Sequence, residues 1–239
     1  MIQVWDAIVM LLATALQVLH GVAGSYVLAI ILLTIGIRFV LHPLTRKQLK
    51  SMKAMQTLQP QMEVLRRKYK DNPQQLNAEV MNLYRTSGVN PFQGCLPLLL
   101  QLPVLYALFA VLRRPNVFGG ETLFGVALEK APWPLEVFVQ HPLLLIIPLL
   151  SGFTTYYQQK MSITDPQQAK MLIFMPLMVG WFATQFAIGL SIYWIASTTL
   201  AIVEYFVVVG PPKRVGTAPP KEQRKQPKPS QAAKPQENR

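Results

Sequence analysis

The sequence has only one cysteine, and it lacks the motifs of most enzymes. Cys95 stands alone, so no internal disulfide can form, and no CxxC pair or His/Cys cluster with metal-ligand spacing occurs. His20, His42 and His141 are far apart at the ends of apolar stretches, where we interpret them as structural or interfacial. There is also no P-loop, GxSxG or HExxH motif. The sequence therefore predicts neither an enzyme nor a protein that holds a cofactor or metal.

Charged residues are scarce too, at 14% of the chain, whereas 51% of the residues are apolar. A soluble domain has about a quarter charged residues, so the excess apolar surface must face something other than water. The net charge of +12 first suggests nucleic-acid binding. However, the basic residues collect in two blocks beside apolar stretches instead of on a folded basic domain, so we expect no DNA partner.

Five apolar runs approach the length of a membrane span. A bilayer core of about 30 Å requires about 20 helical residues. The runs are Ser25 to Leu44, Gly94 to Leu112, His141 to Gln158, Lys170 to Phe186 and Leu190 to Val209. The sequence therefore predicts an all-α membrane protein, whose core at 25–209 is a five-span transmembrane helix bundle.

The N-terminal stretch from Val4 to Leu19 is also apolar, but it is shorter and carries Asp6 and Gln17 near its ends. It lacks the positive n-region and the cleavage site of a signal peptide. We interpret residues 1–24 as an interfacial helix on the outer surface. The alternative is a sixth span.

The basic blocks predict the orientation in the cell membrane. Nine basic and three acidic residues lie at 45–93, and eight basic and two acidic residues lie at 210–239. The positive-inside rule places both blocks in the cytoplasm. With five spans, the N-terminus and the loop at 115–140 are then outside, and the C-terminus is cytoplasmic.

The first basic block has helical periodicity. Apolar residues from Met52 to Tyr69 recur every three or four positions, and Asn72-Pro73 provides an N-cap and a first-turn proline for a second amphipathic stretch. Residues 45–86 are therefore predicted to form a cytoplasmic antiparallel helical hairpin, with a kink at Pro60. The tail at 210–239 is rich in Pro, Lys, Gln and Ala, which predicts a disordered basic arm.

Arg38 lies six residues from the cytoplasmic end of the first predicted span, where a charge costs up to about 2.5 to 3.5 kcal/mol. It either snorkels to the interface or lines a water-filled groove. Other spans offer polar or aromatic side chains near the same depth, which favours the groove. We expect Arg38 to remain a hydrated charge and not half of a fixed ion pair with Glu204. The predicted groove residues are Arg38, Gln101, Thr154, Thr155, Trp194, Ser197 and Glu204.

Several segments resemble the YidC/Oxa/Alb family of membrane protein insertases. They are the intramembrane arginine, the LQP and KYKDNP segments, GVNP-x-x-GC-x-P, TDPQQAKMLIFMP and GLSIYWIASTTLAIVEYF. The resemblance covers Leu28 to about Phe206. It implies a five-span core with a hydrophilic groove in the inner leaflet, in which Arg38 matches the family's groove arginine and Trp194 lies near an aromatic residue that contacts substrate. The chain lacks the large outer domain and the lipoprotein-type N-terminus found in some family members.

The resemblance implies a membrane protein insertase and chaperone that works alone or with the Sec translocon. The expected partners are nascent membrane proteins, the ribosome (through the basic tail and hairpin) and membrane lipids. A small-solute transporter or channel is the alternative, although the internal repeats common in transporters are absent. A binding-only scaffold for membrane complexes also remains open.

Overall fold

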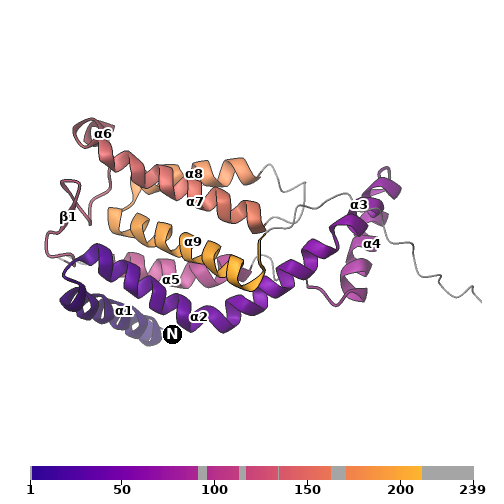
Figure 1. Ribbon diagram of the computed structural model, residues 1–239, viewed down its shortest axis with the longest axis horizontal. Coiled ribbons are helices and arrows are strands. Elements are labelled where there is room, and N and C mark those ends of the chain that lie inside the picture. Colours follow the sequence, from indigo (N-terminus) through magenta and orange to yellow (C-terminus); the bar gives the residue numbers. More distant parts are fainter. Residues whose placement is uncertain (1, 91–95, 113–116, 134, 163–170, 212–239) are drawn as a thin grey trace, which may run out of the picture.

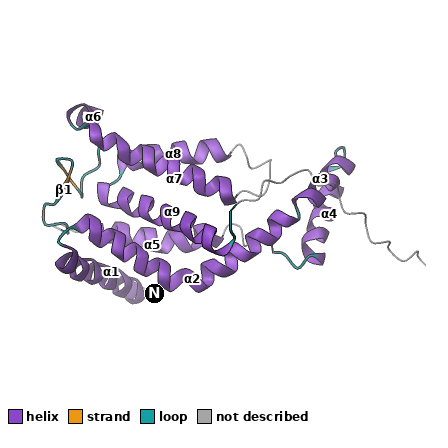
Figure 2. Ribbon diagram, viewed as in Figure 1, coloured by secondary structure: helices purple, strands orange, loops and turns teal. Residues whose placement is uncertain are grey.

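The chain is described here by a computed structural model that covers residues 2–90, 96–112, 117–133, 135–162 and 171–211. Within these ranges it is almost entirely helical, with one small two-stranded ribbon (Figures 1 and 2). The elements are α1 (Ile2–Ala23), α2 (Tyr26–Thr57), α3 (Gln59–Lys68), α4 (Pro73–Thr86), α5 (Leu96–Leu112), β1 (Thr122–Leu123), β2 (Val126–Ala127), α6 (Leu135–Gln140), η2 (Pro142–Leu145), α7 (Ile146–Ser162), α8 (Met171–Gln185) and α9 (Ile188–Val208). The predicted all-α architecture is confirmed for these residues.

Helix α9 occupies the centre of the bundle. It packs against α2 on one side and α7 on the other, and α8 packs against α7. Figure 1 shows these helices running side by side. The main apolar core lies among α1, α2, α5, α9 and the loop after α5, around residues such as Leu16, Ile30 and Leu108. The bundle thus brings together residues from distant parts of the sequence.

Three of the helices in the described ranges are long and apolar enough to cross a membrane: α1, α2 and α9. Helices α5, α7 and α8 have 17, 17 and 15 residues. The predicted starts of the second and fourth spans, Gly94 and Lys170, lie outside the described residues. The total of five spans therefore stays a prediction.

Helix α1 is longer than the predicted apolar stretch and packs along α2 and α5. Val9, Ala13 and Leu16 are buried in these contacts. Its connection to α2 turns at Gly24, whose φ of 70° is easily adopted only by glycine. The 22 residues of α1 would suffice for a span, so both interpretations of the N-terminal segment remain.

Helix α2 continues beyond the predicted end of the first span. It passes through Pro43 and Leu44 without a break and ends at Thr57. The sequence predicted a kink at Pro60 in the interior of a helix, but Pro60 lies in the first turn of α3. The prediction was wrong because proline lacks an N–H, and a first-turn N–H has no intrahelical partner to lose.

The helical pair after α2 is shorter than the hairpin predicted at 45–86, because residues 45–57 belong to α2. Helices α3 and α4 contact each other, and the Tyr84 hydroxyl donates to Met62 Sδ at 3.2 Å. The predicted cap is confirmed, because Asn72 Oδ1 accepts the N–H of Gln75 at 3.1 Å and Pro73 starts α4. The pair's cytoplasmic location stays a prediction.

The loop between α5 and α6 covers one end of the bundle. Its strands β1 and β2 pair antiparallel, and Phe118 is buried against Gly189 of α9. A Cβ at Gly189 would lie 2.8 Å from the Phe118 ring. The loop is also bonded to α9 by its backbone, because Gly189 N–H donates to Leu128 O at 3.0 Å.

The same loop caps the N-terminus of α2. Glu121 accepts the Tyr26 N–H at 2.6 Å and the Ser25 hydroxyl at 2.7 Å. His20 stacks on Tyr26 with ring centroids 3.8 Å apart, and its Nε2 is 4.0 Å from Glu121. Burial raises the pKa of the Glu121 carboxyl group, but the hydrogen bonds from Tyr26, Ser25 and Val27, with the nearby His20, outweigh burial and hold the pKa below its ordinary value.

We expect Glu121→Gln to lower thermal stability at neutral pH and to reduce its acid sensitivity. A carboxylate whose folded pKa is depressed stabilises the protein above its unfolded pKa, and this contribution is lost as the pH falls through the folded pKa. The melting temperature of the wild type should therefore decrease as the pH drops below the ordinary glutamate pKa of about 4.3. The melting temperature of the variant should decrease less. Thermal unfolding in detergent against pH measures this. Glu129→Gln in the same loop, at an exposed position, is the control. If Glu121→Gln keeps the full acid dependence, Glu121 is not its source.

Candidate functional site

A cavity of about 370 Å³ lies between α2, α5, α7, α8 and α9. Its wall is apolar in large part, but every one of these helices except α8 adds polar side chains to it. Of the seven predicted groove residues, five line the cavity: Arg38, Gln101, Thr155, Trp194 and Ser197. Arg38 is the only lining residue in the described ranges with a formal charge.

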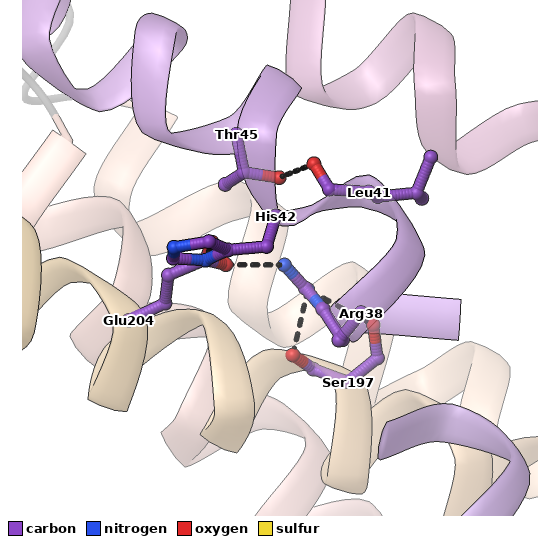
Figure 3. Close-up of polar contacts among 6 residues, drawn as sticks. All are labelled: Arg38, Leu41, His42, Thr45, Ser197 and Glu204. Carbon is purple, nitrogen blue, oxygen red and sulfur yellow. Dashed lines mark hydrogen bonds and ion pairs between the residues drawn. The ribbon is translucent and has the colours of Figure 1, made fainter. Parts of the chain in front are cut away.

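Arg38 lies on α2 and forms hydrogen bonds to α9 (Figure 3). Its Nη2 donates to the backbone oxygen of Ser197 at 2.7 Å and to the Ser197 hydroxyl at 3.0 Å. Its Nη1 lies 3.6 Å from Glu204 Oε2, and the two side chains are 20% and 10% exposed. The expectation that Arg38 is not paired with Glu204 was therefore wrong. Two opposite charges that are partly buried avoid part of their desolvation cost by lying together.

His42 is one of the residues of this polar cluster that the sequence interpretation missed. Its Nδ1 lies 2.7 Å from Glu204 Oε1, so the Glu204 carboxylate contacts both Arg38 and His42 (Figure 3). His42 is one helical turn beyond Arg38, on the same face of α2. That spacing of four was a signal in the sequence, but it becomes informative only when Glu204 is known to face it. Glu204 itself lies beside the cavity and is not among its lining residues.

A second set of polar contacts joins α7 to α9. Trp194 Nε1 donates to the Thr155 hydroxyl at 3.0 Å, and the Thr198 hydroxyl donates to Thr154 Oγ1 at 2.9 Å. Thr154 and Thr155 are both buried. Thr155 lines the cavity, whereas Thr154 lies behind it between the two helices. These contacts hold the cavity wall together and place the Trp194 ring at its surface.

Gln101 ties α5 to the same wall. Its Nε2 donates to the Tyr193 hydroxyl at 2.8 Å, and Tyr193 is only 2% exposed. Tyr193 was not predicted as a groove residue. A tyrosine between apolar neighbours on a span usually indicates packing, so its sequence carries no distinct signal.

The far end of the cavity, where α7 and α9 end, is partly covered by an apolar cluster. Met52, Met161 and Tyr205 are buried there together. Gln56 of α2 donates to Met161 O at 3.0 Å and lies 3.4 Å from the Tyr205 hydroxyl. The extension of α2 beyond the predicted span therefore forms part of the wall at the end that the sequence predicts to be cytoplasmic.

The cavity lining consists of groups that can bind polar ligands. In the described ranges no three His, Cys, Asp or Glu side chains come together as they would around a metal ion. The lining provides hydroxyl groups, amides, indole and one guanidinium group. Such a surface binds polar or acidic groups within an otherwise apolar bundle.

Comparisons with known proteins give consistent matches. Residues 18–213 match the family described as 60Kd inner membrane protein. The chain is 37% identical over 202 residues to the membrane protein insertase YidC of Caldanaerobacter subterraneus subsp. tengcongensis, covering 84% of this chain and 93% of that one. It is 36% identical over 199 residues to the membrane protein insertase YidC of Campylobacter jejuni, covering 81% of this chain and 36% of that one.

A solved structure is similar as well. An active YidC insertase, in a crystal structure with the first transmembrane domain resolved, matches with a TM-score of 0.66 and 30% identity. The match covers 84% of this chain and 46% of that one. The chain spans a little over a third of the length of the Campylobacter jejuni and Geobacter sulfurreducens relatives.

Proposed function

Because the chain belongs to the 60Kd inner membrane protein family, a family of multi-pass membrane proteins, we propose that it is a membrane protein insertase and chaperone. In this role it would help nascent membrane proteins to enter the bilayer and fold there, alone or beside the Sec translocon. The observation that carries the proposal is a cavity inside an apolar helix bundle that is lined by polar side chains from four helices and, among the described residues, by one cation, Arg38. A polar segment on its way across the membrane would need such a surface.

In the proposed mechanism, the polar outer segment of a substrate rests in the cavity while its apolar segment moves along the bundle into lipid. The helices expose apolar side chains to the surroundings, among them Phe39 of α2 at 81% and Phe153 of α7 at 64%. Burial of apolar substrate surface in lipid provides about 25 cal/mol per Å². The membrane potential adds about 2.3 kcal/mol per charge per 100 mV, and it drives acidic segments outward. Insertion by this route requires no nucleotide.

Photocrosslinking to stalled nascent chains tests this function. A crosslinking residue at Val104 or Ile202, both in the cavity lining, should capture a ribosome-bound single-span substrate. Val22 on α1, which is 83% exposed and outside the lining, is the control position. Equal capture at Val22, or no capture in the cavity, would argue against the function.

We propose a topology with five spans, the N-terminus outside, and the α3–α4 hairpin and tail in the cytoplasm. Single cysteines in a Cys95→Ser background test it by labelling with a membrane-impermeant thiol reagent. Lys68→Cys should label only from the inside and Glu129→Cys only from the outside. Asp6→Cys separates the two interpretations of α1: outside labelling supports an interfacial helix and inside labelling a sixth span. Labelling of Lys68→Cys from outside contradicts the topology.

The ribosome is a proposed partner through the basic tail at 210–239, of which residues 212–239 lie outside the described residues. Clusters of Lys and Arg residues bind polyanions with strong salt dependence. Truncation after Pro212 should therefore weaken ribosome co-sedimentation at low salt. Alanine substitution of Arg67, Lys68 and Lys70 in the hairpin measures separately how much the hairpin contributes to ribosome binding. Unchanged binding in both variants would remove the ribosome from the partners and leave anionic lipid as the alternative.

A further inference from the structure

The Glu204 carboxylate lies between two basic side chains of α2, and it is closer to one of them. Its Oε1 is 2.7 Å from His42 Nδ1, whereas its Oε2 is 3.6 Å from Arg38 Nη1. A carboxylate only accepts hydrogen bonds, so His42 Nδ1 is the donor in the short contact. The longer contact exceeds the range of about 2.7 to 2.9 Å for a charge-assisted hydrogen bond. Glu204 is therefore hydrogen-bonded to His42 and only loosely paired with Arg38.

Arg38 is held on its other side by Ser197. Its Nη2 donates to the backbone oxygen of Ser197 at 2.7 Å and to the hydroxyl at 3.0 Å. Ser197 and Glu204 lie about two turns apart on α9, and Figure 3 shows the guanidinium group bonded toward both. An arginine and a carboxylate often pair through two parallel N–H···O bonds. Here Ser197 accepts from Nη2 and His42 donates to Oε1, so the pair is not of that tight kind.

Arg38 lines the cavity, whereas His42 and Glu204 are outside its lining. A carboxylate close to an arginine cancels more of the arginine's positive potential than a distant one does. We propose that His42 is a positioning residue, whose hydrogen bond holds Glu204 back from Arg38. The guanidinium group then keeps a larger positive potential toward the cavity. His42 and Glu204 together set how strongly the protein prefers substrates with acidic outer segments, a role that rests on the proposed insertase function.

Substitutions at these two residues should change the preference in opposite directions. His42→Leu removes the donor, so Glu204 moves closer to Arg38 and cancels more of its charge. Glu204→Gln removes the carboxylate, so more of the charge acts on the cavity. The ratio of acidic to neutral substrate inserted should fall about threefold to tenfold in His42→Leu and rise by a similar factor in Glu204→Gln, the size expected for one hydrogen bond.

An insertion assay with the full-length protein in proteoliposomes measures this ratio. The two substrates are single-span proteins that differ only in the outer segment, which carries Asp residues in one and Asn residues at the same positions in the other. The membrane potential is fixed at one value for all variants, because the potential itself acts on the acidic substrate. Melting temperatures in detergent report separately on the folding of each variant.

Two further variants separate positioning from general damage. His42→Asn should restore the wild-type ratio, because the asparagine amide donates from nearly the same place as Nδ1 but carries no charge. His20→Leu is the matched control. It removes a histidine 4.0 Å from Glu121, beside the first turn of α2 and outside the cavity lining. Its ratio should equal that of the wild type even where its melting temperature falls.

A purely structural His42 would affect both substrates alike, so a wild-type ratio in His42→Leu would overturn the proposal. A ratio that does not rise in Glu204→Gln would overturn it as well. Failure of His42→Asn to restore the ratio would assign the effect to an imidazolium charge instead. Insertion of the neutral substrate by the wild type keeps the outcomes distinct: if that substrate is inserted, the insertase function stands whatever the ratios are.

Discussion

Arg38→Ala is expected to lower both the insertion of substrates with acidic outer segments and the stability of the bundle. The substitution removes the hydrogen bonds to Ser197 and leaves Glu204 without its guanidinium partner. Removing one member of a fully buried pair costs about 3 to 5 kcal/mol. Here we expect about 1 to 3 kcal/mol, because the pair is partly exposed and His42 still contacts the Glu204 carboxylate.

The double variant Arg38→Ala with Glu204→Gln separates the two effects. It should regain much of the lost stability, because no carboxylate then lacks its cation, while insertion of acidic substrates stays low. Thermal unfolding and an insertion assay in proteoliposomes measure the two quantities. Ser197→Ala is the matched control, since it removes one hydroxyl contact of Arg38 and no charge. Equal stability of Arg38→Ala and the double variant would mean that the 3.6 Å contact contributes no net stability.

Gly180→Leu is expected to disrupt the packing of α8 on α7. These helices approach so closely that a Cβ on Gly180 would lie 3.2 Å from the Pro148 carbonyl oxygen and 3.9 Å from the Gly152 Cα. The neighbours are backbone atoms, which cannot rotate away as a side chain can. Membrane helices often use small residues for such contacts. Overpacking of this kind costs about 1 to 3 kcal/mol or more.

The control for Gly180→Leu is Gly36→Leu on α2. A Cβ at Gly36 meets nothing within 4 Å, and the position is exposed, so the same added side chain should be tolerated there. Melting temperatures of the two variants in detergent provide the comparison. Equal melting temperatures would show that the α7–α8 contact does not limit stability.

Apolar runs predicted several helices closely. The last predicted span, Leu190 to Val209, agrees with α9 at Ile188–Val208, and the second, ending at Leu112, ends with α5. The end of α2 was not predicted, because bilayer thickness limits the buried length of a helix and not its total length. The amphipathic continuation to Thr57 packs on protein and needs no apolar run.

Only some residues of the cavity and its polar cluster could be predicted from the sequence. Matching depth selected Arg38 and Ser197, and the structure brings them into contact. His42 was missed because its contact with Glu204 depends on the rotation of α2 relative to α9. Spacing along one helix reveals which residues share a face. It does not reveal which neighbouring helix that face meets.

The continuity of α2 has a mechanical consequence. Its 32 residues extend about 48 Å, well beyond a bilayer core of about 30 Å. The helical pair α3–α4 is attached at its far end (Figure 1). Because α2 is continuous through Pro43, the α3–α4 pair and one wall of the cavity are joined by a single helix. We expect a force applied to the α3–α4 pair to reach the cavity through this helix, because Arg38 and Met52 both line the cavity from it.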